Sequence, residues 1–169
     1  MGFGTDTNMR RGAVLALSLG LFLLASTSMA ATHACMHQQL HIANAEIRAT
    51  APSAPVTGGY LHIHNKSDKS QRLIAVMADF AQHIELHEMR HENGVMKMTP
   101  LENGIEIPAG TAVQLKPGGL HIMFMQLTAQ LKPLEMHEVK LVFDGCGEMQ
   151  AKFMVVKKPA SGHSQKHQH

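Results

Sequence analysis

The feature that most constrains the fold is a series of short segments in which apolar and polar residues alternate, each ended by a turn signal. Residues 83–89 alternate, Glu92-Asn93-Gly94 supplies a hairpin turn, and residues 95–99 alternate again. Asn-Gly suits a two-residue hairpin turn because both central positions need a positive φ. Alternation with period two places every second side chain on one face of a strand. The pattern therefore predicts β-structure.

Eight further short segments, some alternating and some mainly apolar, are also predicted as strands: 40–49, 60–64, 72–77, 105–107, 111–115, 120–127, 138–143 and 150–156. Most of them have Gly, Pro, Asn or Asp, which favour turns, close to at least one end. Many short strands at this spacing are typical of a sandwich or a barrel. The sequence predicts an all-β domain.

The first thirty residues have the pattern of a secretory signal peptide. Arg10 and Arg11 precede the apolar run 13–24, and Ser28-Met29-Ala30 offers small residues for cleavage. The run is shorter than the roughly 20 residues that cross a bilayer; an N-terminal membrane anchor is the alternative. We expect a signal peptide over 1–30, export to the periplasm, a domain over 31–157 with no membrane span, and a flexible polar tail over 158–169.

Two cysteines, Cys35 and Cys146, lie near the two ends of the exported chain. An even count in an oxidising compartment favours a disulfide. The loop it closes is long, so the chain-entropy model gives about 4–5 kcal/mol of stabilisation. The alternative is a thiolate metal ligand or a redox pair, although the sequence has no Cys-x-x-Cys. We expect the disulfide.

The high content of histidine and methionine indicates which kind of ligand the protein binds. The chain has 13 of each in 169 residues. Imidazole and thioether are the neutral side chains that bind late transition metals. A net charge of +2 and an aromatic content of 4% do not fit a nucleic-acid surface. We therefore expect a metal-binding protein with no nucleic-acid partner.

Two familiar metal motifs fit poorly. His87-Glu88-Met89-Arg90-His91 matches the H-E-x-x-H of zinc proteases, which requires a helix. Asn93-Gly94 ends any helix there, and on a strand the two histidines lie about 13 Å apart. A blue-copper site needs His and Met soon after its cysteine. Met149 follows Cys146, but no histidine does before the tail.

A third constellation fits better, and it consists of two histidines and two methionines: His87, Met98, His121 and Met123. His121 and Met123 project to one side of the predicted strand 120–127, and the hairpin brings the His87 and Met98 segments together. These donors form a neutral site in which thioethers favour Cu(I) and imidazoles tolerate Cu(II). Met89 and Met96 are alternative donors.

The same residues resemble the PCuAC family of periplasmic copper chaperones over roughly 39–156. The family motif is a histidine, ten residues, a methionine, some twenty residues, and then His-x-Met. His87 and Met98 have the first spacing, and 22 residues separate Met98 from His121. That is one more than the family pattern, and we place the extra residue near 102–104.

The resemblance implies a cupredoxin-like Greek-key β-barrel that holds Cu(I) near its surface. It implies delivery to the copper centres of cytochrome c oxidase, with a Sco-like thioredoxin-fold protein as a further partner. Some members carry a C-terminal extension that binds a second copper, often Cu(II). The equivalent residues here are three tail histidines: His163, His167 and His169. We expect a carrier rather than an enzyme; the alternative is a copper-sequestering tolerance protein with the same site and no dedicated acceptor.

Overall fold

The computed structural model describes residues 39–157 and 159, and these residues form ten β-strands. The strands are β1 Leu40–Arg48, β2 Val56–Asn65, β3 Gln71–Met77, β4 Ala81–Glu92, β5 Val95–Pro100, β6 Ile105–Ile107, β7 Ala112–Leu115, β8 Leu120–Leu127, β9 Met136–Asp144 and β10 Gly147–Val156. The all-β prediction is confirmed. Most strands lie within three residues of their predicted bounds; β2 begins four residues earlier than predicted, and β4 is longer at both ends.

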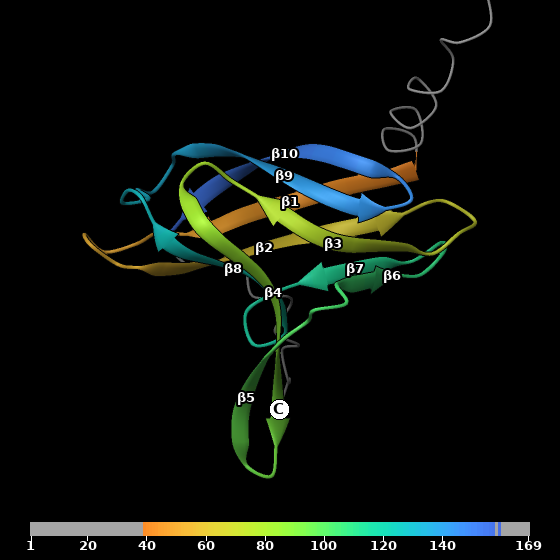
Figure 1. Ribbon diagram of the computed structural model, residues 1–169, viewed down its shortest axis with the longest axis horizontal. Helices are drawn as coiled ribbons and strands as arrows, with labels where there is room; N and C mark the ends of the chain where they lie inside the picture. Colours follow the sequence, from red (N-terminus) through yellow and green to blue (C-terminus); the bar gives the residue numbers. More distant parts are fainter. Residues whose placement is uncertain (1–38, 158, 160–169) are drawn as a thin grey trace, which may run out of the picture.

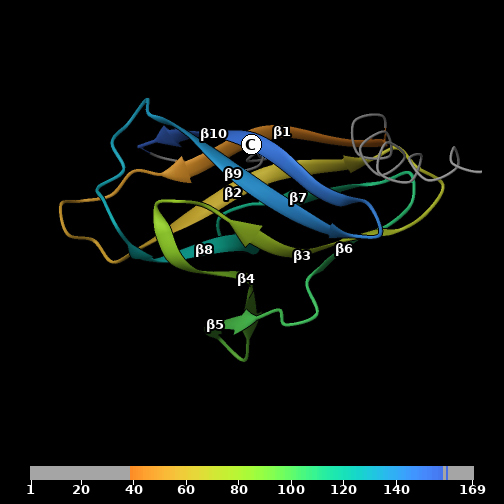
Figure 2. The ribbon, with the colours of Figure 1, turned by 45° about the horizontal axis from the view of Figure 1, so that its top comes forward.

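The strands join in the order β5-β4-β8-β2-β1-β10-β9-β3-β6, and β7 also pairs with β2. Strand β1 runs parallel to β10 and antiparallel to β2. Strand β2 pairs with β8 through residues 56–59 and with β7 through residues 61–64. In Figure 1, β9 and β10 lie along the top, β6 and β7 lie at the lower right of the body, and β5 lies lowest of all; Figure 2 shows the same strands from a second direction. Neighbours so distant in sequence are typical of Greek-key connections.

The core lies between the strands and follows from the alternation. In β10 every second residue from Met149 to Val155 is buried, and the residues between them face solvent. Phe124, Phe143 and Phe153 are the largest fully buried side chains. Burying a side chain of this size stabilises the fold by about 1.5–3 kcal/mol. The rigid body so formed fixes the strands that carry the candidate site.

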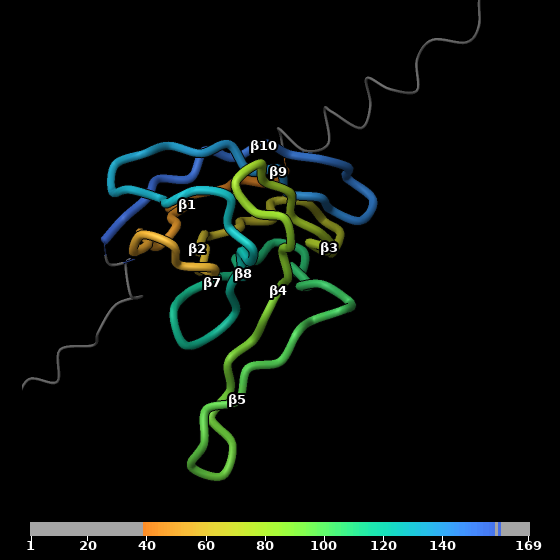
Figure 3. The backbone as a smooth tube through the Cα atoms, turned by 60° about the vertical axis from the view of Figure 1, so that its left-hand side comes forward, coloured from red at the N-terminus to blue at the C-terminus, as the bar shows by residue number. Residues whose placement is uncertain are grey.

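One hairpin leaves this body. Residues 81–88 of β4 pair with β8, whereas residues 87–92 pair with β5. We call residues 88–99 the arm; it projects away from the sheet in Figures 1 and 3. At its tip Asn93 has a φ of 51° and Gly94 a φ of 81°, and a two-residue turn of this kind requires positive φ at both positions. The predicted hairpin is confirmed.

Within residues 39–157, no helix has the length and apolar character needed to cross a membrane.

Candidate metal centre

The pairing of β4 with β8 places the predicted donors side by side. His87 lies opposite His121, and Glu85 lies opposite Met123. Residues directly opposite each other on paired strands project to the same face. One face of these strands therefore carries both histidines and Met123, although 33 residues separate His87 from His121 along the chain.

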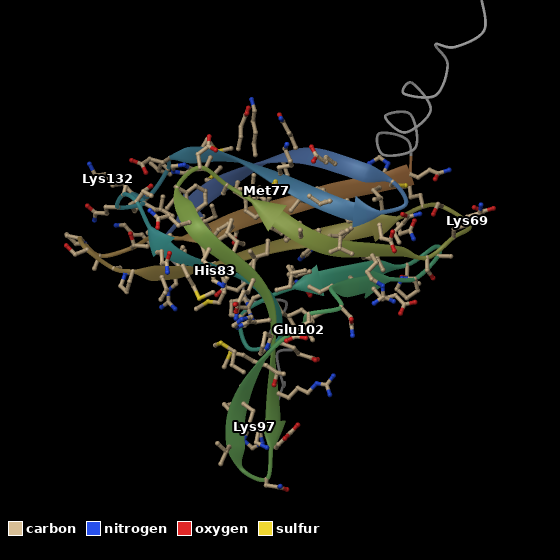
Figure 4. All side chains as sticks on the ribbon, in the orientation of Figure 1. Lys69, Met77, His83, Lys97, Glu102 and Lys132 are labelled. Atoms are coloured by element: carbon tan, nitrogen blue, oxygen red, sulfur yellow. The ribbon has the colours of Figure 1, made fainter. Side chains whose placement is uncertain are left out.

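The hairpin adds the methionines. Met98 of β5 lies opposite Met89 of β4, one step along the same face from His87. Met89, Met98, His121 and Met123 line one groove of about 360 Å³, closed on another side by Gly58 and Tyr60 of β2. Figure 4 shows sulfur atoms at the root of the arm, between the labelled His83 and Lys97. Both Met98 and the predicted alternative Met89 are thus placed to contribute sulfur.

Met96 lies elsewhere. It is opposite His91, two residues further out along the arm than Met98, and does not line the groove. Of the two alternative methionines, only Met89 is beside the paired histidines.

The two imidazoles contact each other and are almost fully enclosed. Their ring centroids are 5.7 Å apart and their planes are inclined by 73°. His87 is 8% exposed and His121 is 4% exposed. By contrast Met98 is 47% exposed. The nitrogen donors are therefore held in the body while at least one sulfur donor faces solvent.

Hydrogen bonds fix which ring nitrogen carries a lone pair. His121 Nδ1 is 2.9 Å from the Gly119 carbonyl oxygen, which only accepts, so Nδ1–H donates and Nε2 keeps its lone pair. His87 Nε2 is 2.6 Å from a Glu85 carboxylate oxygen, which only accepts, so Nε2–H donates and Nδ1 is the nitrogen that carries the lone pair when the ring binds a metal. Partners of this kind orient metal-binding histidines.

Nδ1 of His87 is a buried polar atom without a hydrogen-bond partner among the described residues. A buried acceptor left unpaired costs about 1–3 kcal/mol. A metal ion bound at Nδ1 would remove that cost, so the donor set fits a metal.

Glu85 is the main electrostatic feature beside the pair. Its carboxylate accepts from His87 and, at 2.7 Å, from Nε2 of His83. These hydrogen bonds, that of His87 first, lower the pKa of Glu85 below its ordinary value. Glu85 is therefore a carboxylate at neutral pH and positions both rings.

His121 remains neutral under the same conditions. Burial lowers the pKa of His121, the hydrogen bond to Gly119 opposes this in part, and the neighbouring His87 lowers the pKa further. A neutral imidazole is the form that binds metal.

The donors are mixed nitrogen and sulfur. No three His, Cys, Asp or Glu side chains within residues 39–157 are arranged to hold an ion on their own. The further soft donors that line the groove with His121 are Met89, Met98 and Met123, and thioethers favour Cu(I).

The residues of the zinc-protease motif and of the blue-copper motif do not form metal sites of those two types. His87, Glu88 and His91 lie on strand β4, and Glu88 pairs with Arg90 at 2.7 Å on the other face, so a helical zinc site is absent from this segment. Cys146 is buried at the turn between β9 and β10. In the strand order of the sheet, β9 and β10 are not neighbours of β4, β5 or β8.

Several predictions concern residues outside the described part of the chain. These are the signal peptide over 1–30, Cys35, and the tail residues His163, His167 and His169. The disulfide between Cys35 and Cys146 and the second copper site stay predictions.

Sequence reasoning missed the supporting residues. Glu85 and His83 share the face of His87 at a spacing of two, so the alternation itself carried that signal. Gly119 gave none, because its role depends on a backbone carbonyl that contacts a side chain two residues later.

Comparison with known proteins agrees with this arrangement. Residues 40–155 match the model of the family described as "Putative lipoprotein LpqE-like". The chain belongs to the LpqE-like family. The match includes every strand that carries the candidate site.

Two curated relatives extend the comparison of this LpqE-like protein. "Putative lipoprotein Lxx21020" of Leifsonia xyli subsp. xyli is 31% identical over 93 residues, which are 55% of this chain and 56% of the relative. "Uncharacterized protein RP573" of Rickettsia prowazekii is 28% identical over 85 residues, 50% of this chain and 47% of the relative. The chain spans about half the length of these relatives.

Three solved structures share the fold. The Cu(I) form of DR1885 from Deinococcus radiodurans is 29% identical, with 79% of this chain and 89% of that chain covered and a TM-score of 0.58. The apo PCuAC domain from PmoF1 is 21% identical, with coverage of 70% and 93% and a TM-score of 0.59. The copper-bound PCuAC domain from PmoF2 is 22% identical, with coverage of 69% and 92% and a TM-score of 0.56. The resemblance to the PCuAC family is confirmed.

Proposed function

We propose that this protein is an exported copper chaperone that binds Cu(I) through His87, His121, Met98 and Met123. In this proposal Nδ1 of His87 and Nε2 of His121 are the nitrogen ligands, and two thioethers complete the coordination. Met89, which lies opposite Met98, can replace it. We call this set the inner site.

The observation that carries the proposal is the buried Nδ1 of His87, which has no hydrogen-bond partner within residues 39–157 and lies on a ring in contact with His121. Glu85 and Gly119 occupy the opposite nitrogens of the two rings. Both rings are thus already in the tautomers that a shared ion requires, so little reorganisation opposes binding.

The chemistry of the donors selects the ion. Four neutral donors, two of them thioethers, suit Cu(I), whereas calcium and magnesium require hard oxygen ligands. The DR1885 structure, at 29% identity, is that of a Cu(I) form, which supports the same ion here.

The unequal exposure of the donors suits a carrier. The buried histidines hold the ion, and the half-exposed Met98 gives an incoming ligand access to it. All four donors are neutral and none is a thiolate, so copper is released without separating the cation from a negatively charged ligand. We infer a role in carrying copper rather than in catalysis.

The place and the acceptor complete the proposal. The lipoprotein descriptions of the family and of its Leifsonia relative support export, and we place the protein in the periplasm. We propose the copper domain of cytochrome c oxidase as acceptor, with a Sco-like thioredoxin-fold protein as a further partner.

Copper transfer tests this function. The Cu(I)-loaded protein is mixed without oxygen with the apo copper domain of a cytochrome c oxidase subunit, the two are separated, and copper is measured on each. We expect copper on the oxidase domain. The control variant Met136→Leu changes a methionine that is 52% exposed on β9 and should transfer normally. If copper stays on this protein, the result favours copper sequestration. If this protein does not bind Cu(I) at all, the proposed site is refuted.

A further inference from the structure

The two faces of the arm differ in chemistry. One face carries the charged residues, and two ion pairs hold them together: Arg90 with Glu88 at 2.7 Å and Lys97 with Glu92 at 2.8 Å. The other face carries four residues, all of them metal donors: Met89, His91, Met96 and Met98. Every residue of β5 is exposed, so this second face has no core to fill. Its composition therefore calls for an explanation other than packing.

The register brings these four side chains into close pairs. Glu92 and Val95 flank the two-residue turn, and in such a hairpin they exchange both backbone hydrogen bonds. Bonded and non-bonded pairs alternate from there, and the bond from Leu101 N to Leu86 O, 2.8 Å, fits the alternation. The pairs Met89/Met98 and His91/Met96 are then non-bonded, with Cα atoms about 4.5 Å apart and side chains at their closest.

His91 and Met96, the outer pair of the arm, lie next to the inner site on the same face. Met89 and Met98 line the groove with His121, and His91 and Met96 lie two residues further along the same face. Two residues of strand span about 7 Å. Met96 is 48% exposed and Met98 is 47% exposed, so solvent reaches the whole row. Soft donors thus run without interruption from the buried histidines toward the tip of the arm.

We propose that His91 and Met96, with Met89 from the adjacent pair, form a second Cu(I) site, the arm site, through which the ion enters and leaves the inner site. The proposal rests on the proposed function of the inner site. One imidazole and two thioethers form a neutral set suited to a soft monovalent ion. Met98 of the inner site lies opposite Met89 of the arm site, so an ion can exchange one sulfur ligand for the other over a short step. The arm site has fewer enclosed donors than the inner site and binds more weakly.

A titration of the full chain with Ag(I) tests the arm site. Ag(I) is a soft monovalent ion that does not change oxidation state, and methionines labelled with ¹³C at the ε-methyl report sulfur ligation one residue at a time by NMR. We expect the Met98 and Met123 methyl signals to move with the first equivalent. The Met96 signal and the ring signals of His91 should move as more Ag(I) is added. Met136, of similar exposure at 52%, should not move.

The variant His91→Ala makes the test specific. His91 is exposed, so its loss leaves the fold intact. We expect it to raise the Ag(I) concentration at which Met96 responds by about tenfold or more, since even residues that only support ligands contribute that much. A Met96 signal that stays still, or that responds equally without His91, overturns the arm site while the inner site stands. If Met98 and Met123 also stay still, the proposed function itself is wrong.

Discussion

Replacing Glu85 by alanine should weaken Cu(I) binding although Glu85 is not one of the proposed ligands. Its carboxylate accepts from Nε2 of His87 at 2.6 Å and thereby leaves Nδ1 as the atom that can bind copper. In Glu85→Ala the His87 ring loses this acceptor, so its tautomer and orientation are no longer fixed. Residues that support metal ligands in this way contribute about 10- to 100-fold in affinity. We expect a loss of that size, or about 1.4–2.7 kcal/mol.

The conservative variant separates hydrogen bonding from charge. The amide oxygen of Glu85→Gln can still accept from His87, so we expect a loss of less than about tenfold. The control is Glu148→Ala, which removes an exposed carboxylate paired with Lys140 at 2.8 Å on β9 and β10. Because exposed ion pairs contribute about 0–1 kcal/mol, the control should leave both the fold and copper affinity unchanged.

The assay is competition for Cu(I) against a chromophoric chelator of known affinity, without oxygen and near neutral pH. Melting temperatures of the apo proteins show whether each variant is folded. If Glu85→Ala binds Cu(I) as tightly as the parent, the tautomer argument is refuted. If the glutamine variant loses as much as the alanine variant, the negative charge matters rather than the acceptor.

Three further predictions concern the inner site and the tail. Met123→Leu keeps nearly the same volume, so it should cost less than about 1.5 kcal/mol of unfolding free energy while weakening Cu(I) strongly in the same competition assay; unchanged affinity would exclude Met123 as a ligand. Burial lowers the pKa of His121 below its ordinary 6.5, so the unfolded chain takes up this proton more readily than the folded one. The apo protein should therefore lose stability in urea as the pH falls below about 6.5, and a rise in stability would contradict the burial of a neutral ring. Deleting residues 161–169 should remove one Cu(II) equivalent at neutral pH and leave the Cu(I) equivalent; equal Cu(II) binding by both proteins would show that the tail binds none.

The local parts of the fold and of the site could be predicted from the sequence. Turn residues bound the strands, and Asn93-Gly94 fixed the hairpin that carries Met98 beside the strand of His87. Alternation along 120–127 put His121 and Met123 on one face, which the structure bears out.

The rest depends on contacts between distant strands. No local sequence feature predicts that β4 lies between β5 and β8 in the sheet. Likewise, none predicts that His87 lies opposite His121 rather than opposite a residue one position away. That register is set by burial of the core residues between them, such as Leu86 and Ile122, which also pair. Burial of the histidines was missed for the same reason: the family resemblance implies copper held near the surface, whereas the ligand His121 is only 4% exposed. For this reason Met123→Leu is a cleaner variant than any truncation of His121.

X-ray absorption of the protein loaded with one equivalent of Cu(I) tests the central claim most directly, because it counts the nitrogen and sulfur neighbours of the ion. We predict two nitrogen and two sulfur neighbours in the parent, supplied by His87, His121, Met98 and Met123, and one sulfur neighbour fewer in Met123→Leu. A copper ion with nitrogen or oxygen neighbours alone, or with a sulfur count unchanged by Met123→Leu, would contradict the proposed site.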